Sequence, residues 1–166
     1  MKTVDKKLMA DLVTQAKASP RKRGHYNLHP NLDDKIHRLC MAVEPGSYVR
    51  PHRHLDPKKW ELMVILKGKM DILIFNDNEE VSERYHLDAK GDIRGMEIDA
   101  GSWHTLVSME EGSVVLEIKQ GPYSCLSEKD SCQWAPREGE NGTVEFEIWY
   151  RKAKIGDKAP QIARPS

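Results

Sequence analysis

The sequence lacks the features that mark membrane, secreted and nucleic-acid-binding proteins. It has no apolar run of about 18 residues, so no membrane span is expected. Its 26 basic and 26 acidic side chains cancel, which argues against a dedicated nucleic-acid binder with a basic face. The start, MKTVDKKLMADLVTQAK, has no continuous apolar stretch and predicts an amphipathic helix rather than a signal peptide.

Cysteine is also scarce, and the pattern of a nucleophilic hydrolase is missing. The three cysteines, Cys40, Cys125 and Cys132, form no CxxC pair and cannot all pair within one chain. Free thiols in a reducing cytoplasm are therefore expected, with a Cys125–Cys132 disulfide as the alternative. No serine lies in a G-x-S-x-G motif and no cysteine has a suggestive histidine neighbour, so nucleophilic catalysis is not expected.

The 166 residues suggest one domain, which begins with a helix and an extended arm. Apolar residues recur at helical spacing over Val4–Ala18, and Pro20 ends that pattern. Polar residues then alternate with other residues at a period of two, which predicts an extended segment with one polar face. The polar positions of this arm are Arg21, Arg23, His25, Asn27 and His29.

Short strands and turns dominate the centre of the chain. Their regular short spacing predicts a β-sandwich or a barrel. Beyond them, the segment VEFEIWYR alternates once more, which predicts another extended segment. The strands are expected near Leu39–Val43, Ser47–His54, Trp60–Leu66, Lys69–Asn76, Val81–Leu87, Arg94–Ile98, His104–Ser108 and Val114–Lys119.

The pair His52 and His54 has the spacing of two metal ligands on one strand. Residues i and i+2 of a strand point to the same side, about 6.6 Å apart along the chain. Tyr48 and Arg50 share that face in the segment YVRPHRH. Two imidazoles placed in this way can chelate one ion.

A carboxylate and a third imidazole complete the predicted site. Glu61 opens a strand and shares its face with Met63 and Ile65, where a buried carboxylate is costly unless it is paired or bound to a cation. His104 follows a glycine-containing turn at the start of another strand. Three imidazoles and one carboxylate suit a single divalent ion of Fe, Mn, Zn, Ni or Co.

These residues resemble the motifs of the cupin superfamily. The first motif is matched by Gly46, His52-x-His54, Glu61 and Gly68, with a longer insertion before the glutamate that is predicted to be a loop at Pro57. The second motif is matched at Gly101-Ser-Trp-His104, although Asp99 stands where the motif has proline. The resemblance implies an all-β cupin double-stranded β-helix, or jelly-roll barrel, with an N-terminal α-helix and a short C-terminal extension.

More narrowly, the chain resembles the WbuC-type cupin metalloproteins from Met1 to about Trp149. The segments that carry this likeness are SPRKRGHYNLHPNLDDKIHRL, EPGSYVRPHRH, KWEL, GSWHTLVSMEEGSVVLEIKQGPY and the late WAP. The expected organisation is a helix and arm over residues 1–37, a barrel over 38–121 and an extension over 122–166. That family occurs in gene neighbourhoods for bacterial surface polysaccharide, which implies a sugar or nucleotide-sugar ligand but no particular reaction.

Several polar residues are candidates for contact with a small sugar-like or anionic ligand. Arg50 is expected either to clamp an anion beside the metal or to form a structural ion pair, and Tyr48 either to support the site or to pack. The arm residues are expected either to cover the barrel mouth or to form a strand between the subunits of a homodimer. His37 and His86 are expected on the surface. The arm candidates are Arg23, His25, Asn27 and His29.

Two classes of function remain open from sequence. The first is a metalloenzyme of the isomerase, epimerase or dioxygenase type that acts on a small polyhydroxylated substrate. The second is a non-catalytic protein that binds or senses a small molecule through its metal. A general base beside the open metal positions would separate the two, and the arm histidines are the candidates for that role.

Overall fold

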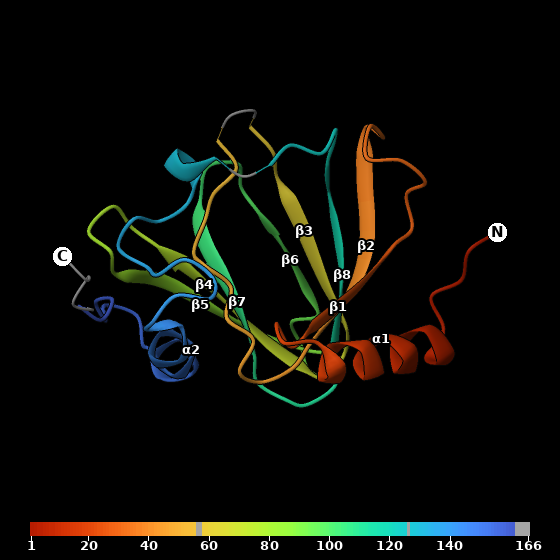
Figure 1. Cartoon of the computed structure of the whole chain (residues 1–166), viewed down its shortest axis with the longest axis horizontal. Helices are drawn as coiled ribbons and strands as arrows, with labels where there is room; N and C mark the ends of the chain where they lie inside the picture. The colour runs from red at the N-terminus through yellow and green to blue at the C-terminus, as the bar shows by residue number, and fades with distance from the viewer. Residues whose placement is uncertain (56–57, 126, 162–166) are drawn as a thin grey trace.

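The computed structural model describes residues 1–55, 58–125 and 127–161, and it is built on two antiparallel sheets. One sheet has the strand order β1-β2-β8-β3-β6 and the other has the order β5-β4-β7 (Figure 1). This arrangement confirms the predicted all-β jelly roll with an N-terminal helix. The strands are β1 (Arg23–Asn27), β2 (Ile36–Val43), β3 (Glu61–Lys67), β4 (Lys69–Phe75), β5 (Val81–Asp88), β6 (Gly95–Ile98), β7 (Trp103–Ser108) and β8 (Ser113–Gln120).

The predicted N-terminal helix is present as α1 (Lys6–Ala18) and covers the five-stranded sheet (Figure 1). The Asp5 side chain caps it by accepting a hydrogen bond from the backbone N–H of Leu8 at 2.9 Å. Leu12 and Ala16 lie one turn apart and are buried together against β2 and β8. The apolar stripe seen in the sequence therefore faces the sheet, as expected for an amphipathic helix.

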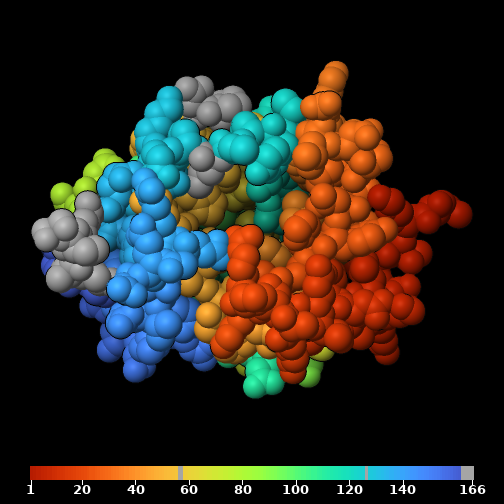
Figure 2. All heavy atoms as spheres, in the orientation of Figure 1, coloured from red at the N-terminus to blue at the C-terminus, as the bar shows by residue number. Residues whose placement is uncertain are grey.

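The predicted extended arm is strand β1, at one edge of the larger sheet. It pairs antiparallel with β2, from Arg23 opposite Val43 to Asn27 opposite Leu39. The period of two in the sequence was therefore a strand signal. On the face shown in Figure 2, this end of the chain meets the C-terminal extension, where Arg21 and Arg23 both pair with Glu138.

The prediction of a strand at Ser47–His54 was wrong. This segment is extended but joins no sheet, and His52 makes only isolated bridges to His104 and Ser131. Pro51 has no N–H to donate, which limits regular pairing next to the histidines. The other predicted strands are present with shifted ends, and the predicted loop at Pro57 lies outside the described residues.

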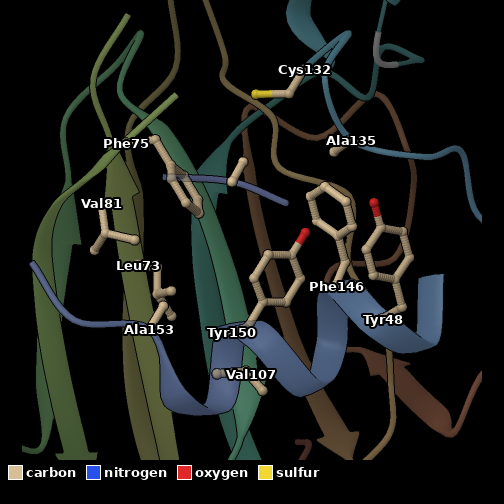
Figure 3. Close-up of a cluster of buried hydrophobic side chains, with 11 residues drawn as sticks. Tyr48, Leu73, Phe75, Val81, Val107, Cys132, Ala135, Phe146, Tyr150 and Ala153 are labelled. Carbon is tan, nitrogen blue, oxygen red and sulfur yellow. The ribbon is translucent and has the colours of Figure 1, made fainter. Parts of the chain in front are cut away.

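The prediction of an extended segment at VEFEIWYR was also wrong, because Thr143–Lys152 forms helix α2. Phe146 and Tyr150 are four residues apart and fully buried, so they lie on one helical face. That face packs against the three-stranded sheet at Leu73, Phe75 and neighbouring side chains (Figure 3). Burial of aromatic area against the sheet decides the conformation of this segment.

All three cysteines are free, as expected: Cys40 and Cys132 are buried and Cys125 is exposed. Within the described part of the chain, no helix has the length and apolar character needed to cross a membrane.

Candidate metal centre

Four side chains from three separate segments of the chain meet between the two sheets. They are the residues predicted from sequence, His52, His54, Glu61 and His104, and one ligand atom from each lies within 4.8 Å of the others. The two histidines of the H-x-H pair come from the extended segment, Glu61 begins β3 and His104 lies in β7. The cluster could hold a metal ion, and it is the only such group of three or more found among the described residues.

Backbone carbonyls orient two of the imidazoles. Nδ1 of His52 lies 3.0 Å from the carbonyl oxygen of Arg50, and Nδ1 of His104 lies 2.9 Å from that of Ser102. When Nδ1 carries the proton and donates to the carbonyl, the lone pair of Nε2 is left for a metal. In both histidines, the contact between Nδ1 and the carbonyl two residues earlier thus leaves Nε2 available as a metal ligand.

Glu61 holds the centre of the cluster with little exposure to solvent. Its carboxylate lies 3.1 Å from Nε2 of His104, 3.0 Å from Nε2 of His54 and 3.1 Å from Nζ of Lys119. Burial raises the pKa of Glu61, but the contacts with His104, His54 and Lys119 together lower it well below its usual value. The carboxylate is therefore ionised and available as a hard oxygen ligand.

Nε2 of His54 is a buried nitrogen that lacks a hydrogen bond within the described structure. It is close to Glu61, but the contact lacks hydrogen-bond alignment. A buried polar atom without a partner is costly in a folded protein. Because His54 lies beside a carboxylate and two other imidazoles, the residues present fit a divalent cation.

Lys119 compensates the negative charge behind the cluster. It lies opposite Glu61 in the β3–β8 pairing, and its Nζ is also 2.5 Å from Oε1 of Glu117. Burial lowers the pKa of Lys119, but the carboxylates of Glu117 and Glu61 raise it more. Burial and the nearby Glu61 in turn raise the pKa of Glu117.

The H-x-H segment is held from the outside by the C-terminal extension. Arg53 lies between the two histidines and contacts Asp130 twice. The backbone N–H of Arg53 donates to the carbonyl of Asp130 at 2.9 Å, and Nε of Arg53 lies 3.4 Å from the carboxylate of Asp130. The Arg53 guanidinium also lies over the Trp103 ring, 4.2 Å from its centre. A segment far away in sequence therefore fixes the direction of the two metal-ligand candidates.

His52 is predicted to make the metal-free protein less stable in acid. Burial and the neighbouring His104 lower the pKa of His52 from 6.5 to about 3, so the folded chain keeps this ring neutral. Between these values the unfolded chain binds the extra proton, and stability falls as the pH decreases. We expect the chelator-treated protein to lose somewhat less than about 1.4 kcal/mol per pH unit from this ring, because its side chain still borders the cavity.

Urea unfolding of the chelator-treated protein between about pH 7 and about pH 4 measures this loss. The variant His52→Asn is expected to show a flatter dependence, whereas His25→Asn, at an exposed position on β1, should follow the unmodified protein. Parallel curves for the unmodified protein and His52→Asn would contradict the prediction.

The two other candidates on the H-x-H segment do not border the cavity beside the cluster. Arg50 donates from Nε to the carbonyl of Cys132 at 3.0 Å, and its guanidinium lies 3.5 Å from the carboxylate of Glu128. Contact of Arg50 with an anionic ligand remains a prediction. Tyr48 packs in the aromatic cluster and donates its hydroxyl to the carbonyl of Pro136 at 2.6 Å (Figure 3). Burial raises the pKa of Tyr48 far above its usual value, so this hydroxyl stays protonated.

The arm candidates are also outside the lining of this cavity. Arg23 pairs with Glu138, His25 is exposed, and Asn27 is partly buried on β1. His29 is buried and stacks on His37, with ring centres 4.1 Å apart. Contact of these four residues with a ligand remains a prediction.

The cavity has a volume of about 200 Å³ and opens beside His52 and His54. The expectation that His37 is a surface residue was wrong: its ring is buried in the cavity wall, with Nε2 2.9 Å from the carbonyl of Leu32. His86 does have an exposed side chain, as expected. The remaining lining residues are Lys59, Lys119, Gln120, Pro122, Tyr123 and Ser124.

One protein-family model matches the sequence. A family model described as "Domain of unknown function (DUF6016)" matches residues 4–87, just over half of the chain. No curated protein matches the sequence.

Three solved structures resemble the chain at low identity, and they show the fold alone. The capsular polysaccharide assembling protein CapF from Staphylococcus aureus has a TM-score of 0.53 and 14% identity, over 69% of this chain and 32% of that chain. The protein BH2720 from Bacillus halodurans has a TM-score of 0.51 and 13% identity, over 75% and 84% of the two chains. The SPY1581 protein of unknown function from Streptococcus pyogenes has a TM-score of 0.50 and 17% identity, over 74% and 90%.

Proposed function

The chain belongs to the family described as a domain of unknown function (DUF6016), and from its side chains we propose that it is a divalent-metal-binding cupin that acts on a small sugar-like ligand. One observation carries the proposal: three imidazoles and one carboxylate converge so that their ligand atoms lie within 4.8 Å of one another. Buried ionisable groups rarely gather in this way without a cation or a proton to share. The ligands of the ion are His52, His54, Glu61 and His104.

Each group around the ion has a separate task. A bound divalent ion supplies Lewis-acid polarisation of a hydroxyl–carbonyl pair or a lowered pKa of bound water. The carbonyls of Arg50 and Ser102 keep the histidines in the required tautomer, and Lys119 balances the charge of Glu61. The cavity beside the cluster then admits a ligand to the same centre.

A sugar-like ligand is supported by two independent likenesses. CapF, a capsular polysaccharide assembling protein, shares the fold, although this chain covers only 32% of it. The sequence segments described above resemble the WbuC-type cupins, which occur beside genes for surface polysaccharide. Isomerase, epimerase or dioxygenase chemistry in polysaccharide metabolism is the enzymatic form of the proposal.

One observation favours the non-catalytic alternative, a metal-dependent binding or sensor protein. Two cavity residues that could move a proton, Lys59 and His37, are engaged with backbone carbonyls within the described structure. Lys59 donates to the carbonyl of Pro122 at 2.5 Å, and Nε2 of His37 lies 2.9 Å from the carbonyl of Leu32. A base that is held in this way must first exchange its partner before it can serve a substrate.

Metal content tests the proposal directly. Protein purified without an affinity tag is expected to contain about one equivalent of a divalent metal by elemental mass spectrometry. Iron would direct the search to O₂-consuming reactions, and Zn, Mn, Ni or Co would direct it to isomerase-type or binding roles. Protein that remains metal-free even after reconstitution with each ion would contradict the proposal.

A further inference from the structure

Lys59 is a buried cation in the wall of the cavity that opens beside the metal centre. It is only 7% exposed, and no carboxylate of the described residues lies within ion-pair distance of it. Its Nζ donates instead to the carbonyl of Pro122 at 2.5 Å and to Oγ of Ser124 at 3.3 Å. An ammonium group has three donors, so one N–H has no partner among the residues that the structure describes.

We propose that this cavity binds a compact hydroxylated molecule that carries one anionic group, a carboxylate or a phosphate, and that Lys59 contacts the anionic group. The proposal rests on the proposed function for its second anchor, because the opposite side of the cavity is formed by the metal-ligand candidates His52 and His54. A buried ammonium without a counter-ion is costly, and an anionic ligand would supply that counter-ion.

The charges around the cavity favour an anion over a neutral ligand. Lys119 also borders the cavity, but its charge is matched by the carboxylates of Glu61 and Glu117, which lie 3.1 Å and 2.5 Å from its Nζ. The charge of Lys59 is not matched by any side chain that the structure describes, so it is the one available to a ligand. A divalent cation on the adjoining side would make the cavity still more positive.

The size and the polar lining restrict the ligand further. The volume of about 200 Å³ is below the roughly 300–1,000 Å³ of sites for drug-sized ligands, so the cavity cannot enclose a complete nucleotide sugar. Gln120, Tyr123 and Ser124 provide an amide and two hydroxyl groups at the same walls. These groups suit the hydroxyls of a hydroxy acid, a sugar acid or a sugar phosphate.

Isothermal titration calorimetry on the metal-loaded full chain tests this proposal. The anionic probes are D-glycerate, D-glucuronate and D-glucose 6-phosphate, and the neutral probes are glycerol and D-glucose. We expect at least one anionic probe to bind about tenfold or more tighter than its neutral counterpart. Comparison of the carboxylate probes with the phosphate probe then shows which anionic group the cavity binds.

Substitution of Lys59 separates this proposal from the metal centre. Lys59→Met keeps the aliphatic length and is expected to lose the anion preference by about tenfold, whereas Lys58→Met, at the exposed neighbouring position, should keep it. Metal content, measured on the same samples, should be the same in both variants. Equal binding of charged and neutral probes, no binding of any probe, or a preference that survives Lys59→Met would overturn the anion site.

The two proposals fail in different ways in this experiment. If the unmodified chain holds no metal, the proposed function fails, and the same titrations on chelator-treated protein decide whether Lys59 alone gives the anion preference. If the chain holds metal but does not prefer the anionic probes, only the anion site fails.

Discussion

The double variant His52→Ala/His104→Ala is expected to lose nearly all bound metal while keeping a folded barrel. It removes two of the four ligand candidates, and in both of these residues Nδ1 contacts a backbone carbonyl. A site with two ligands left, His54 and Glu61, cannot hold a divalent ion against a chelator, so metal content should fall to less than about a tenth of that of the unmodified protein.

The fold should survive because the backbone contacts at these positions do not need the side chains. The N–H of His52 donates to the carbonyl of His104 at 3.0 Å, and the reverse bond is 2.8 Å. The matched control is His25→Ala, which removes an exposed imidazole from β1 and should leave metal content unchanged. Circular dichroism checks the fold, and near-stoichiometric metal in the folded double variant would exclude this assignment of ligands.

The metal-ligand candidates could be predicted because their signals are local. His52 and His54 are one residue apart, and any extended backbone places them on the same side, whether or not it joins a sheet. Glu61 begins a run that is otherwise apolar, which marks it as a buried charge that needs a partner. The N-terminal helix was predictable for the same reason, because its stripe of apolar residues is contained in one short segment.

The surroundings of the cluster could not be predicted because they depend on strand register and on remote segments. Lys119 lies beside the metal-ligand candidate Glu61 only because the pairing of β3 with β8 places the two residues opposite each other. No local sequence pattern predicts that pairing. Lys59 is buried by contacts with Pro122 and Ser124, which are remote in sequence. Alternation alone predicts that Arg50 faces the cavity, whereas its guanidinium contacts Glu128 and the carbonyl of Cys132, which are remote in sequence.

The C-terminal helix shows a limit of periodicity in short segments. Residues 144–151 alternate in polarity, yet Phe146, Trp149 and Tyr150 also fit one face of a helix. Both conformations bury aromatic groups, so the sequence alone does not choose between them. Packing against Phe75 and the other side chains of the three-stranded sheet selects the helix.

Arg84→Met is expected to be the most destabilising single substitution among those considered, because Arg84 attaches this helix to the sheet. Its guanidinium pairs with the buried carboxylate of Asp71 and donates to three backbone carbonyls at the end of α2. Those carbonyls belong to Tyr150, Arg151 and Ala153. Because α2 ends at Lys152, no later N–H group of the helix is available to them. One side chain thus neutralises a buried charge and caps a helix.

Removal of this guanidinium should lower the free energy of unfolding by about 3–5 kcal/mol, because it leaves the Asp71 carboxylate buried with one charged partner fewer. His86 remains 2.8 Å from that carboxylate, but its side chain is 72% exposed and does not reach the helix. Urea unfolding at neutral pH measures the change. Arg94→Met, at an exposed arginine, is the control and should change stability by less than about 0.5 kcal/mol.

A second substitution distinguishes the buried charge from the helix cap. Asp71→Asn in the Arg84→Met background removes the uncompensated charge but does not restore the lost bonds to the α2 carbonyls. If the charge dominates, the double variant should regain a large part of the lost stability, and if the cap dominates it should regain little. A loss below about 1 kcal/mol for Arg84→Met alone would mean that the pair contributes no more than an exposed ion pair, and that aromatic packing by itself holds α2 in place.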